Sequence, residues 1–218
     1  MNFEKARLNM VEQQIRPWEV LDQRVLDVIL ESQRDAFVPA EYQGLAYSDT
    51  RIPIGHGETM MSPKVEGRLL QALDIQPHER GLEIGTGTGY LCSLLATLSS
   101  QVVSVDIHAN FTEDASKRLS ARGINNVELV HQDACEGLSQ AAPYDYIAVT
   151  GAMSSVPTTL KNQLAVGGRL FVIVGKAPIM EATLIERIGD EIYTQEALFE
   201  TELKYLNGAE APVEFKFD

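Results

Sequence analysis

Three glycines at alternate positions, Gly85, Gly87 and Gly89, directly follow an apolar segment at residues 81–84. Glycine is favoured where the backbone must turn tightly or approach a ligand closely. In an open α/β sheet such a turn lies at the carboxyl end of a strand, where ligands bind. The spacing is not the G-x-G-x-x-G of dinucleotide-binding proteins, because Tyr90 stands where the third glycine would be. The segment predicts a small-molecule site for another ligand, and a tight turn without a ligand is the alternative.

Two acidic residues, Asp106 and Asp133, close the next two strand candidates along the chain. An acid about 20 residues after the first glycine is placed to accept hydrogen bonds from ribose hydroxyls, and Asp106 meets that spacing. Each acid also has a plainer interpretation, as a turn residue for Asp106 and as a helix N-cap for Asp133. Three features at the ends of three consecutive strands are nevertheless much more specific for a ligand site than any one of them.

The glycine turn, with Glu83 two residues before its first glycine, resembles the first motif of class I S-adenosylmethionine-dependent methyltransferases. The resemblance implies S-adenosyl-L-methionine as the cofactor and S-adenosyl-L-homocysteine as the product. In that pattern the acid at position 133 binds the adenine amino group, and the neighbouring backbone contacts the ring. The cofactor-binding residues that the resemblance implies are Glu83, Gly85, Thr86, Gly87, Gly89, Asp106, Ile107, Asp133, Ala134 and Thr150.

Short apolar segments alternate with helical ones from about residue 80 onward. We expect strands at residues 81–84, 102–105, 127–130, 146–149 and 170–174, and helices at 89–99, 111–122 and 157–165. This alternation is typical of a parallel sheet covered on both faces. Beyond Gly175 the segments 182–188, 191–199 and 201–206 look like successive strands, which would add antiparallel edge strands. The fold class is therefore α/β, a doubly wound, mostly parallel, Rossmann-like sheet.

The chain before this core predicts an N-terminal helical extension. Residues 1–42 are helical in pattern, with Pro17 ending a first helix and Asp22 as the N-cap of a second. Residues 43–62 look irregular, and Ser62 with Pro63 predicts the start of another helix. We expect one methyltransferase domain over residues 1–218, comprising N-terminal helices and an active-site loop (1–75), a cofactor-binding core (80–175) and C-terminal strands with a tail (180–218).

Composition limits the partners that the chain is expected to bind. The formal net charge is −13, whereas binding to nucleic acid needs clustered Lys and Arg, so neither nucleic acid nor membrane is an expected partner. The two cysteines, Cys92 and Cys135, are too few for a disulfide framework, and Cys92 lies in an apolar run that predicts a core position. The four histidines lack metal-ligand spacing, so no metal is expected and we interpret them as structural or exposed. The expected location is the cytoplasm.

Stretches spread along most of the chain carry a narrower resemblance, at residues 10–16, 24–27, 36–39, 46–49, 53–55, 82–90, 142–145, 147–150 and 163–170. Through them the chain, from about residue 8 to about residue 206, resembles the protein-L-isoaspartate O-methyltransferase family. The helix, tyrosine-containing loop and Pro-Ile-Gly stretch before the glycine turn are peculiar to that family. Its members methylate the free α-carboxylate of isoaspartyl residues in damaged proteins, and the ester then collapses to a succinimide.

The active-site loop departs from the family pattern. The family reads Gly-Gln-Thr-Ile-Ser-Gln-Pro, and this chain reads Gly-Glu-Thr-Met-Met-Ser-Pro at residues 57–63. Thr59 matches and would border the transferred methyl, whereas Met61 stands at the position of the family serine. A thioether cannot replace a hydroxyl donor, and the carboxylate of Glu58 would repel a carboxylate substrate. The C-terminal strand departs too, with Leu203-Lys204-Tyr205-Leu206 where the family tends toward Phe-Val-Pro-Leu.

Three functions are consistent with this combination. The first is methylation of isoaspartyl residues in protein or peptide substrates. The second is methyl transfer to another acceptor, which Glu58 would favour if that acceptor were neutral or cationic. The third is a cofactor-binding protein without transfer activity. The oligomeric state is not predicted by the sequence.

Overall fold

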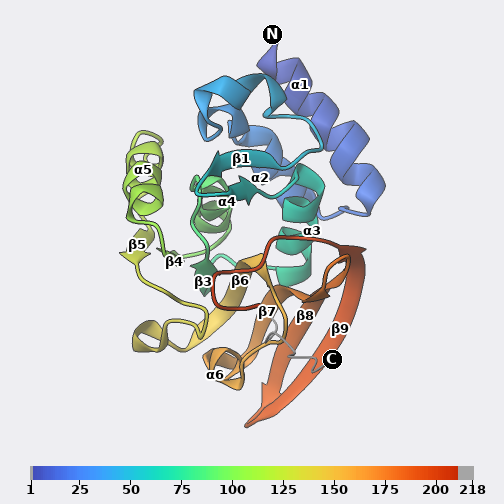
Figure 1. The fold of residues 1–218 in the computed structure, drawn as a ribbon. Helices are drawn as coiled ribbons and strands as arrows, with labels where there is room; N and C mark the ends of the chain where they lie inside the picture. The colour runs from blue at the N-terminus through green and yellow to red at the C-terminus, as the bar shows by residue number, and fades with distance from the viewer. Residues whose placement is uncertain (1, 211–218) are drawn as a thin grey trace, which may run out of the picture.

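The computed structural model describes residues 2–210, and a seven-stranded sheet forms its centre (Figure 1). The strand order is β5-β4-β3-β6-β7-β8-β9, in which β5 to β7 run parallel and β8 and β9 are antiparallel additions. The predicted doubly wound α/β fold with antiparallel C-terminal edge strands is confirmed. The strands are β3 (Arg80–Ile84), β4 (Gln101–Asp106), β5 (Val127–His131), β6 (Tyr144–Met153), β7 (Leu164–Lys176), β8 (Ile179–Gly189) and β9 (Ile192–Thr201).

Successive side chains of the parallel strands enter two separate apolar clusters, one on each face of the sheet. In β6, Tyr146 and Ala148 face one cluster, and Ile147 and Val149 face the other. This alternation follows from the two-residue period of a strand. Since both faces are covered, the strands are apolar runs rather than alternating patterns, which is why they could be recognised in the sequence.

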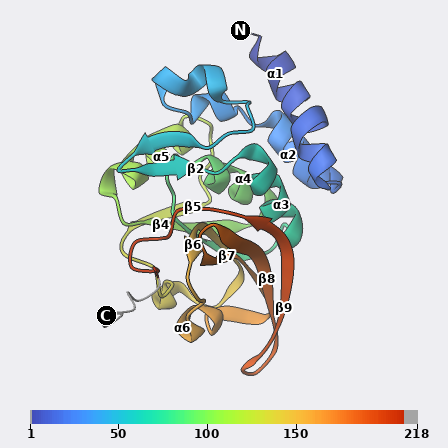
Figure 2. The same cartoon turned by 45° about the vertical axis from the view of Figure 1, so that its right-hand side comes forward.

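The helices divide between the two faces (Figures 1 and 2). The first cluster includes side chains of α2 (Gln23–Glu31), α3 (Pro63–Leu73), α4 (Tyr90–Leu98) and α5 (Ala109–Ser120). The second cluster includes Leu160 of the short α6 (Thr158–Lys161). Among residues 2–210, no helix has the length and apolar character needed to cross a membrane.

The N-terminal extension is helical, as predicted. The helix α1 (Phe3–Met10) continues as a π-helical segment (Val11–Ile15) and a 3-10 turn (Arg16–Trp18), so the helical path ends one residue after Pro17. Asp22 caps α2, and its carboxylate accepts a hydrogen bond from the Arg24 amide at 2.8 Å. The N-terminal segments pack above α3 and α4, with which they share an apolar cluster (Figure 2).

The segment expected to be irregular, residues 43–62, contains an ordered hairpin. Strand β1 (Ile52–Gly55) pairs antiparallel with β2 (Glu58–Met60), and the turn between them has positive φ at Gly55, His56 and Gly57. The prediction of irregular structure was wrong here because each strand is only three or four residues long. The hairpin lies over the sheet edge where β3 and β4 end (Figure 1).

Two further predictions of secondary structure were wrong. The helix expected at residues 157–165 ends at Lys161, because β7 begins at Leu164, which pairs with Tyr144 of β6. The strand expected at 201–206 is not formed, since β9 ends at Thr201. The chain instead crosses the end of β6, where Tyr205 makes a single bridge with Ala152.

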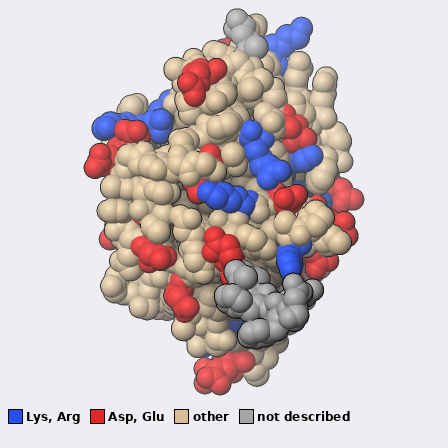
Figure 3. Space-filling view, in the orientation of Figure 1, with Lys and Arg blue, Asp and Glu red and all other residues tan. Residues whose placement is uncertain are grey.

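Charged side chains are interspersed on the face shown in Figure 3, where Lys and Arg lie among Asp and Glu and form no continuous basic surface. Some charged side chains of the described residues form ion pairs, such as Lys117 with Asp114 on α5 at 2.8 Å. Such exposed pairs contribute little to stability.

Gly81 is needed because the ring of Tyr146 occupies the space beside it. The two residues are paired partners in β3 and β6, and a Cβ on Gly81 would fall 2.0 Å from the Tyr146 ring. The Tyr146 side chain is fully buried, and its hydroxyl lies 2.8 Å from Ser99 Oγ. The ring therefore cannot move aside without breaking a buried hydrogen bond.

We expect Gly81→Ala to lower the free energy of unfolding by about 1–3 kcal/mol or more, because the added methyl group overpacks the core. Urea denaturation measures this change. Gly44→Ala is the matched control, since a Cβ there meets nothing within 4 Å and its expected effect is within about 0.5 kcal/mol. Equal stabilities for the two variants would contradict the role given to Tyr146.

Candidate active site

One cavity opens where β3, β4 and β6 end, at the carboxyl edge of the sheet. Its walls come from the glycine turn after β3, from the β1–β2 hairpin with the following loop, and from the segment after β9. From β3 the sheet extends one way through β4 and β5 and the other way through β6 and β7. Ligands of open α/β sheets bind at the point where the strand order changes direction in this way. The predicted site residues that line it are Thr59, Met61, Glu83, Gly85, Thr86, Gly87, Asp106, Ile107, Asp133, Ala134 and Thr150.

The glycine turn has backbone conformations that only glycine adopts readily. Gly85, Gly87 and Gly89 all have positive φ, at 99°, 51° and 83°. The Thr150 hydroxyl donates to the carbonyl oxygens of Ile84 and Gly85, each at 2.9 Å. A Cβ on Gly85 would fall 2.1 Å from the hydroxyl oxygen of Thr150. Thr150 therefore fixes the turn from β6.

Gly89 is the one predicted cofactor-binding residue that is not among the cavity's lining residues. A Cβ on Gly89 would lie 2.9 Å from the Cβ of Ala115 in α5. Its lack of a side chain allows α4 and α5 to pack closely. The side chain of Tyr90, the residue that excluded the dinucleotide motif, is buried and contacts the ring of Phe37 at 5.6 Å.

Asp106 and Asp133 present carboxylates to the same cavity from neighbouring strand ends. Asp106 accepts hydrogen bonds from the Gly87 amide at 2.8 Å and from the His108 amide at 2.9 Å, so its orientation is fixed. Asp133 accepts from the Cys135 amide at 3.0 Å. No helix begins at Asp133, so the alternative interpretation as a helix N-cap is wrong.

Glu83 is fully buried beneath the glycine turn. Its Oε2 accepts a hydrogen bond from Ser104, whose hydroxyl also pairs with Thr86 at 2.6 Å, while its Oε1 has no partner. Burial raises the pKa of Glu83 to about 8 from its ordinary value of 4.5. An unpartnered buried acceptor that lines the cavity fits a ligand that brings a donor or a positive charge.

A buried ion pair that the sequence did not reveal holds the active-site loop, residues 57–63, which is called the acceptor loop from here on. Arg34 is fully buried, pairs with Glu66 of α3, and donates to the carbonyl oxygen of Met61 at 2.7 Å. The guanidinium also lies over the Tyr90 ring, 4.6 Å from its centroid. Burial raises the pKa of Glu66 to about 7, against the opposing effect of Arg34. The pair fixes the backbone at the position of the family serine.

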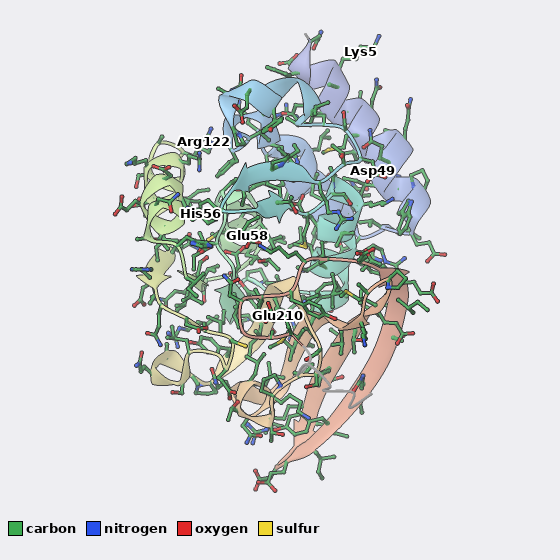
Figure 4. All side chains as sticks on the ribbon, viewed as in Figure 1. Lys5, Asp49, His56, Glu58, Arg122 and Glu210 are labelled. Carbon is green, nitrogen blue, oxygen red and sulfur yellow. The ribbon has the colours of Figure 1, made fainter. Side chains whose placement is uncertain are left out.

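Sequence reasoning missed several lining residues. Glu66 could have been noticed, because it lies three and four residues before the buried Leu69 and Leu70 and so falls on the apolar face of α3. His108, which was interpreted as structural or exposed, lines the cavity and stacks on His56 with ring centroids 4.0 Å apart. The sequence marked Lys204 only as a departure from the apolar stretch of the family. In the structure Lys204 lines the cavity and pairs with Glu58, which Figure 4 labels.

A glycine turn and two strand-end carboxylates around one cavity, on a seven-stranded mostly parallel sheet, define a class I S-adenosylmethionine-dependent methyltransferase. A family model described as protein-L-isoaspartate(D-aspartate) O-methyltransferase (PCMT) matches residues 5–206. The chain therefore belongs to this family. It is an O-methyltransferase, and its cofactor is S-adenosyl-L-methionine.

Individual relatives agree with this assignment. A protein-L-isoaspartate O-methyltransferase of Aeropyrum pernix is 42% identical over 192 residues, which are 86% of this chain and 74% of that protein. The enzyme of the same name from Methylorubrum populi is 42% identical over 170 residues, 78% of this chain and 80% of that protein.

Solved structures have the same fold. A protein-L-isoaspartate O-methyltransferase superposes with a TM-score of 0.78 at 26% identity, covering 94% of this chain and 66% of the other. A putative member from Plasmodium falciparum, in complex with S-adenosyl-L-homocysteine, has a TM-score of 0.77 at 19% identity and covers 94% and 98% of the two chains.

We expect Glu83→Gln to change how stability depends on pH. A carboxyl group with a raised pKa in the folded state stabilises the fold below its unfolded pKa, and that contribution is lost as pH rises toward the folded value. The free energy of unfolding of the wild type should therefore fall relative to Glu83→Gln between about pH 5 and pH 8, by roughly 1–3 kcal/mol. Urea denaturation of both proteins across that range measures the difference, and parallel profiles would contradict the burial of a neutral Glu83.

Proposed function

We propose that this enzyme transfers the methyl group of S-adenosyl-L-methionine to the free α-carboxylate of isoaspartyl residues in proteins and peptides. The observation that carries the proposal is that a single cavity joins the cofactor residues Asp106 and Asp133 to the acceptor-loop residues Thr59 and Met61. Family membership supports it, because the relatives described above are named for this reaction.

The chemistry asks little of the protein beyond positioning. S-adenosyl-L-methionine supplies an electrophilic methyl group on a sulfonium, and the acceptor carboxylate is already a nucleophile that needs no general base. Asp106 would hold the ribose hydroxyls, Asp133 and the adjoining backbone would hold the adenine, and Glu83 lies near the glycine turn with a free acceptor. The contribution of the chain is orientation and the exclusion of water.

The departures in the acceptor loop are compatible with this reaction. Met61 supplies an apolar wall rather than a hydroxyl donor, and its backbone is fixed by Arg34. The carboxylate of Glu58, which would repel a carboxylate substrate, is paired with the ammonium of Lys204. The repulsion that the sequence predicted is therefore reduced by a cation that arrives from the C-terminal part of the chain.

We also infer a cytoplasmic location. Cys92 and Cys135 are both free thiols, and proteins with unpaired cysteines are typical of reducing compartments. The inference does not affect the choice of substrate.

Incubation with labelled S-adenosyl-L-methionine tests the proposal directly. We expect methyl transfer to a peptide that contains an isoaspartyl residue and none to the aspartyl peptide of the same composition. Cofactor binding is measured on the same sample. Binding without transfer to the isoaspartyl peptide would contradict the proposed substrate and would favour another acceptor or a protein that only binds the cofactor.

The cofactor site has its own test. We expect Asp106→Ala to weaken cofactor binding about 10- to 100-fold, because a charged hydrogen-bond acceptor for the ribose is lost. Isothermal titration calorimetry measures the affinity, and circular dichroism shows whether the variant is folded. Asp114→Ala, on the exposed side of α5, is the control that should bind the cofactor as the wild type does. An unchanged affinity in Asp106→Ala would exclude the assigned role.

A further inference from the structure

The cavity has an unequal distribution of charge. Of the described residues that line it, five carry carboxyl groups, and Lys204 is the only lysine or arginine. Binding of a carboxylate among these acids requires a local positive charge to offset their repulsion. The five acids are Glu58, Glu66, Glu83, Asp106 and Asp133.

Four of these five acids either have a partner or lie away from the acceptor loop. Glu66 pairs with Arg34, and Glu83 is buried beneath the glycine turn with its pKa raised. Asp106 and Asp133 lie at the strand ends assigned to the ribose and the adenine. This leaves Glu58 as the acid of the acceptor loop, and its partner is Lys204.

The backbone of Lys204 is fixed, whereas its side chain has room to move. Its carbonyl oxygen accepts a hydrogen bond from the Ala152 amide at 2.8 Å, and the neighbouring Tyr205 donates its hydroxyl to the Gly175 carbonyl at 2.8 Å. Leu203 on the other side is buried. The Lys204 side chain itself is 51% exposed. The fold therefore places the base of a long, half-exposed side chain at the cavity.

The ammonium of Lys204 meets the β1–β2 hairpin. It pairs with the Glu58 carboxylate, and the Gly57 carbonyl oxygen lies 3.4 Å away. Figure 4 labels Glu58, which begins the second strand of the hairpin. An ammonium group has three donors, so at least one remains available for another acceptor. The lysine of the cavity is thus already paired with a carboxylate of the enzyme itself, that of Glu58.

We infer that Lys204 binds the α-carboxylate of the substrate, and that Glu58 takes the place of this carboxylate in the free enzyme. The inference rests on the proposed function. Binding exchanges one carboxylate for another on the same ammonium. The carboxylate of the substrate is then paired, and the displaced Glu58, whose side chain is 25% exposed, is left to solvent. The hydroxyl donor that Met61 cannot supply is replaced by a charged donor from a different part of the chain.

The same exchange favours release of the product. In the transfer step, a carboxylate oxygen forms a bond to the methyl carbon, and the electron pair of the S–CH3 bond goes to sulfur. No proton is moved, and the acceptor changes from an anion to a neutral ester. An ester is a weaker partner for an ammonium than a carboxylate is, so Lys204 returns to Glu58.

The test compares two peptides that differ only in one group, measured at equilibrium with S-adenosyl-L-homocysteine present. One contains isoaspartate with a free α-carboxylate, and the other has an α-carboxamide at that position. The wild type should bind the carboxylate peptide more tightly. We expect Lys204→Met to weaken binding of the carboxylate peptide about 10-fold and to change that of the carboxamide peptide less than about 2-fold. Lys204→Arg should retain most of the preference for the carboxylate.

Glu58→Gln should have the opposite effect and tighten binding of the carboxylate peptide about 3-fold, because it removes the competing carboxylate. Lys117→Met, which removes a lysine from an exposed ion pair of α5, is the matched control and should bind both peptides as the wild type does. Affinity for S-adenosyl-L-homocysteine is measured in every variant, and an unchanged value shows that the cofactor half of the site is intact.

Two different failures can be told apart. If the wild type binds the carboxylate peptide and Lys204→Met binds it equally well, or loses both peptides equally, Lys204 serves only to tether the hairpin and the inference is overturned. If the wild type binds S-adenosyl-L-homocysteine but neither peptide, the proposed function itself is wrong, and the role of Lys204 fails with it.

Discussion

The parallel alignment of β3, β4 and β6 is the constraint on which the site depends. Parallel neighbouring strands end at the same edge of a sheet, so residues that follow them meet although they are far apart in the chain. The glycine turn, Asp106 and Thr150 come together in this way. Hydrogen bonds to the backbone of the turn then fix it. The Gly85 amide donates to the Val105 carbonyl oxygen at 2.8 Å, and the Thr150 hydroxyl donates to the Gly85 carbonyl oxygen.

The acceptor side is built by different means. It consists of the β1–β2 hairpin and the segment after β9, and neither belongs to the main sheet. Charged pairs hold both of them. Arg34 and Glu66 fix the loop after the hairpin from beneath, and Lys204 joins Glu58 at its turn. A buried ion pair is costly to form, but removal of one partner leaves an uncompensated charge, so such pairs define a single arrangement.

This division explains how the chain combines a typical cofactor site with an altered acceptor loop. The cofactor half depends on backbone geometry and strand-end carboxylates, which tolerate little change. The acceptor half is lined by side chains from separate segments, including Met61 and Lys204. In the proposed function, Lys204 is the cation that allows this anionic cavity to accept a carboxylate.

The sequence by itself determined the strands, their mostly parallel order, the glycine turn and the strand-end acids, because these depend on local periodicity and backbone conformation. Its errors fell at short elements, such as the β1–β2 hairpin and the segment 201–206, where pairing depends on distant residues. Only the tertiary structure decided the partners of Arg34 and Lys204. Lys204 is 146 residues from Glu58 in the chain, so no local pattern could pair them, and the crossing of the segment after β9 over β6 brings them together.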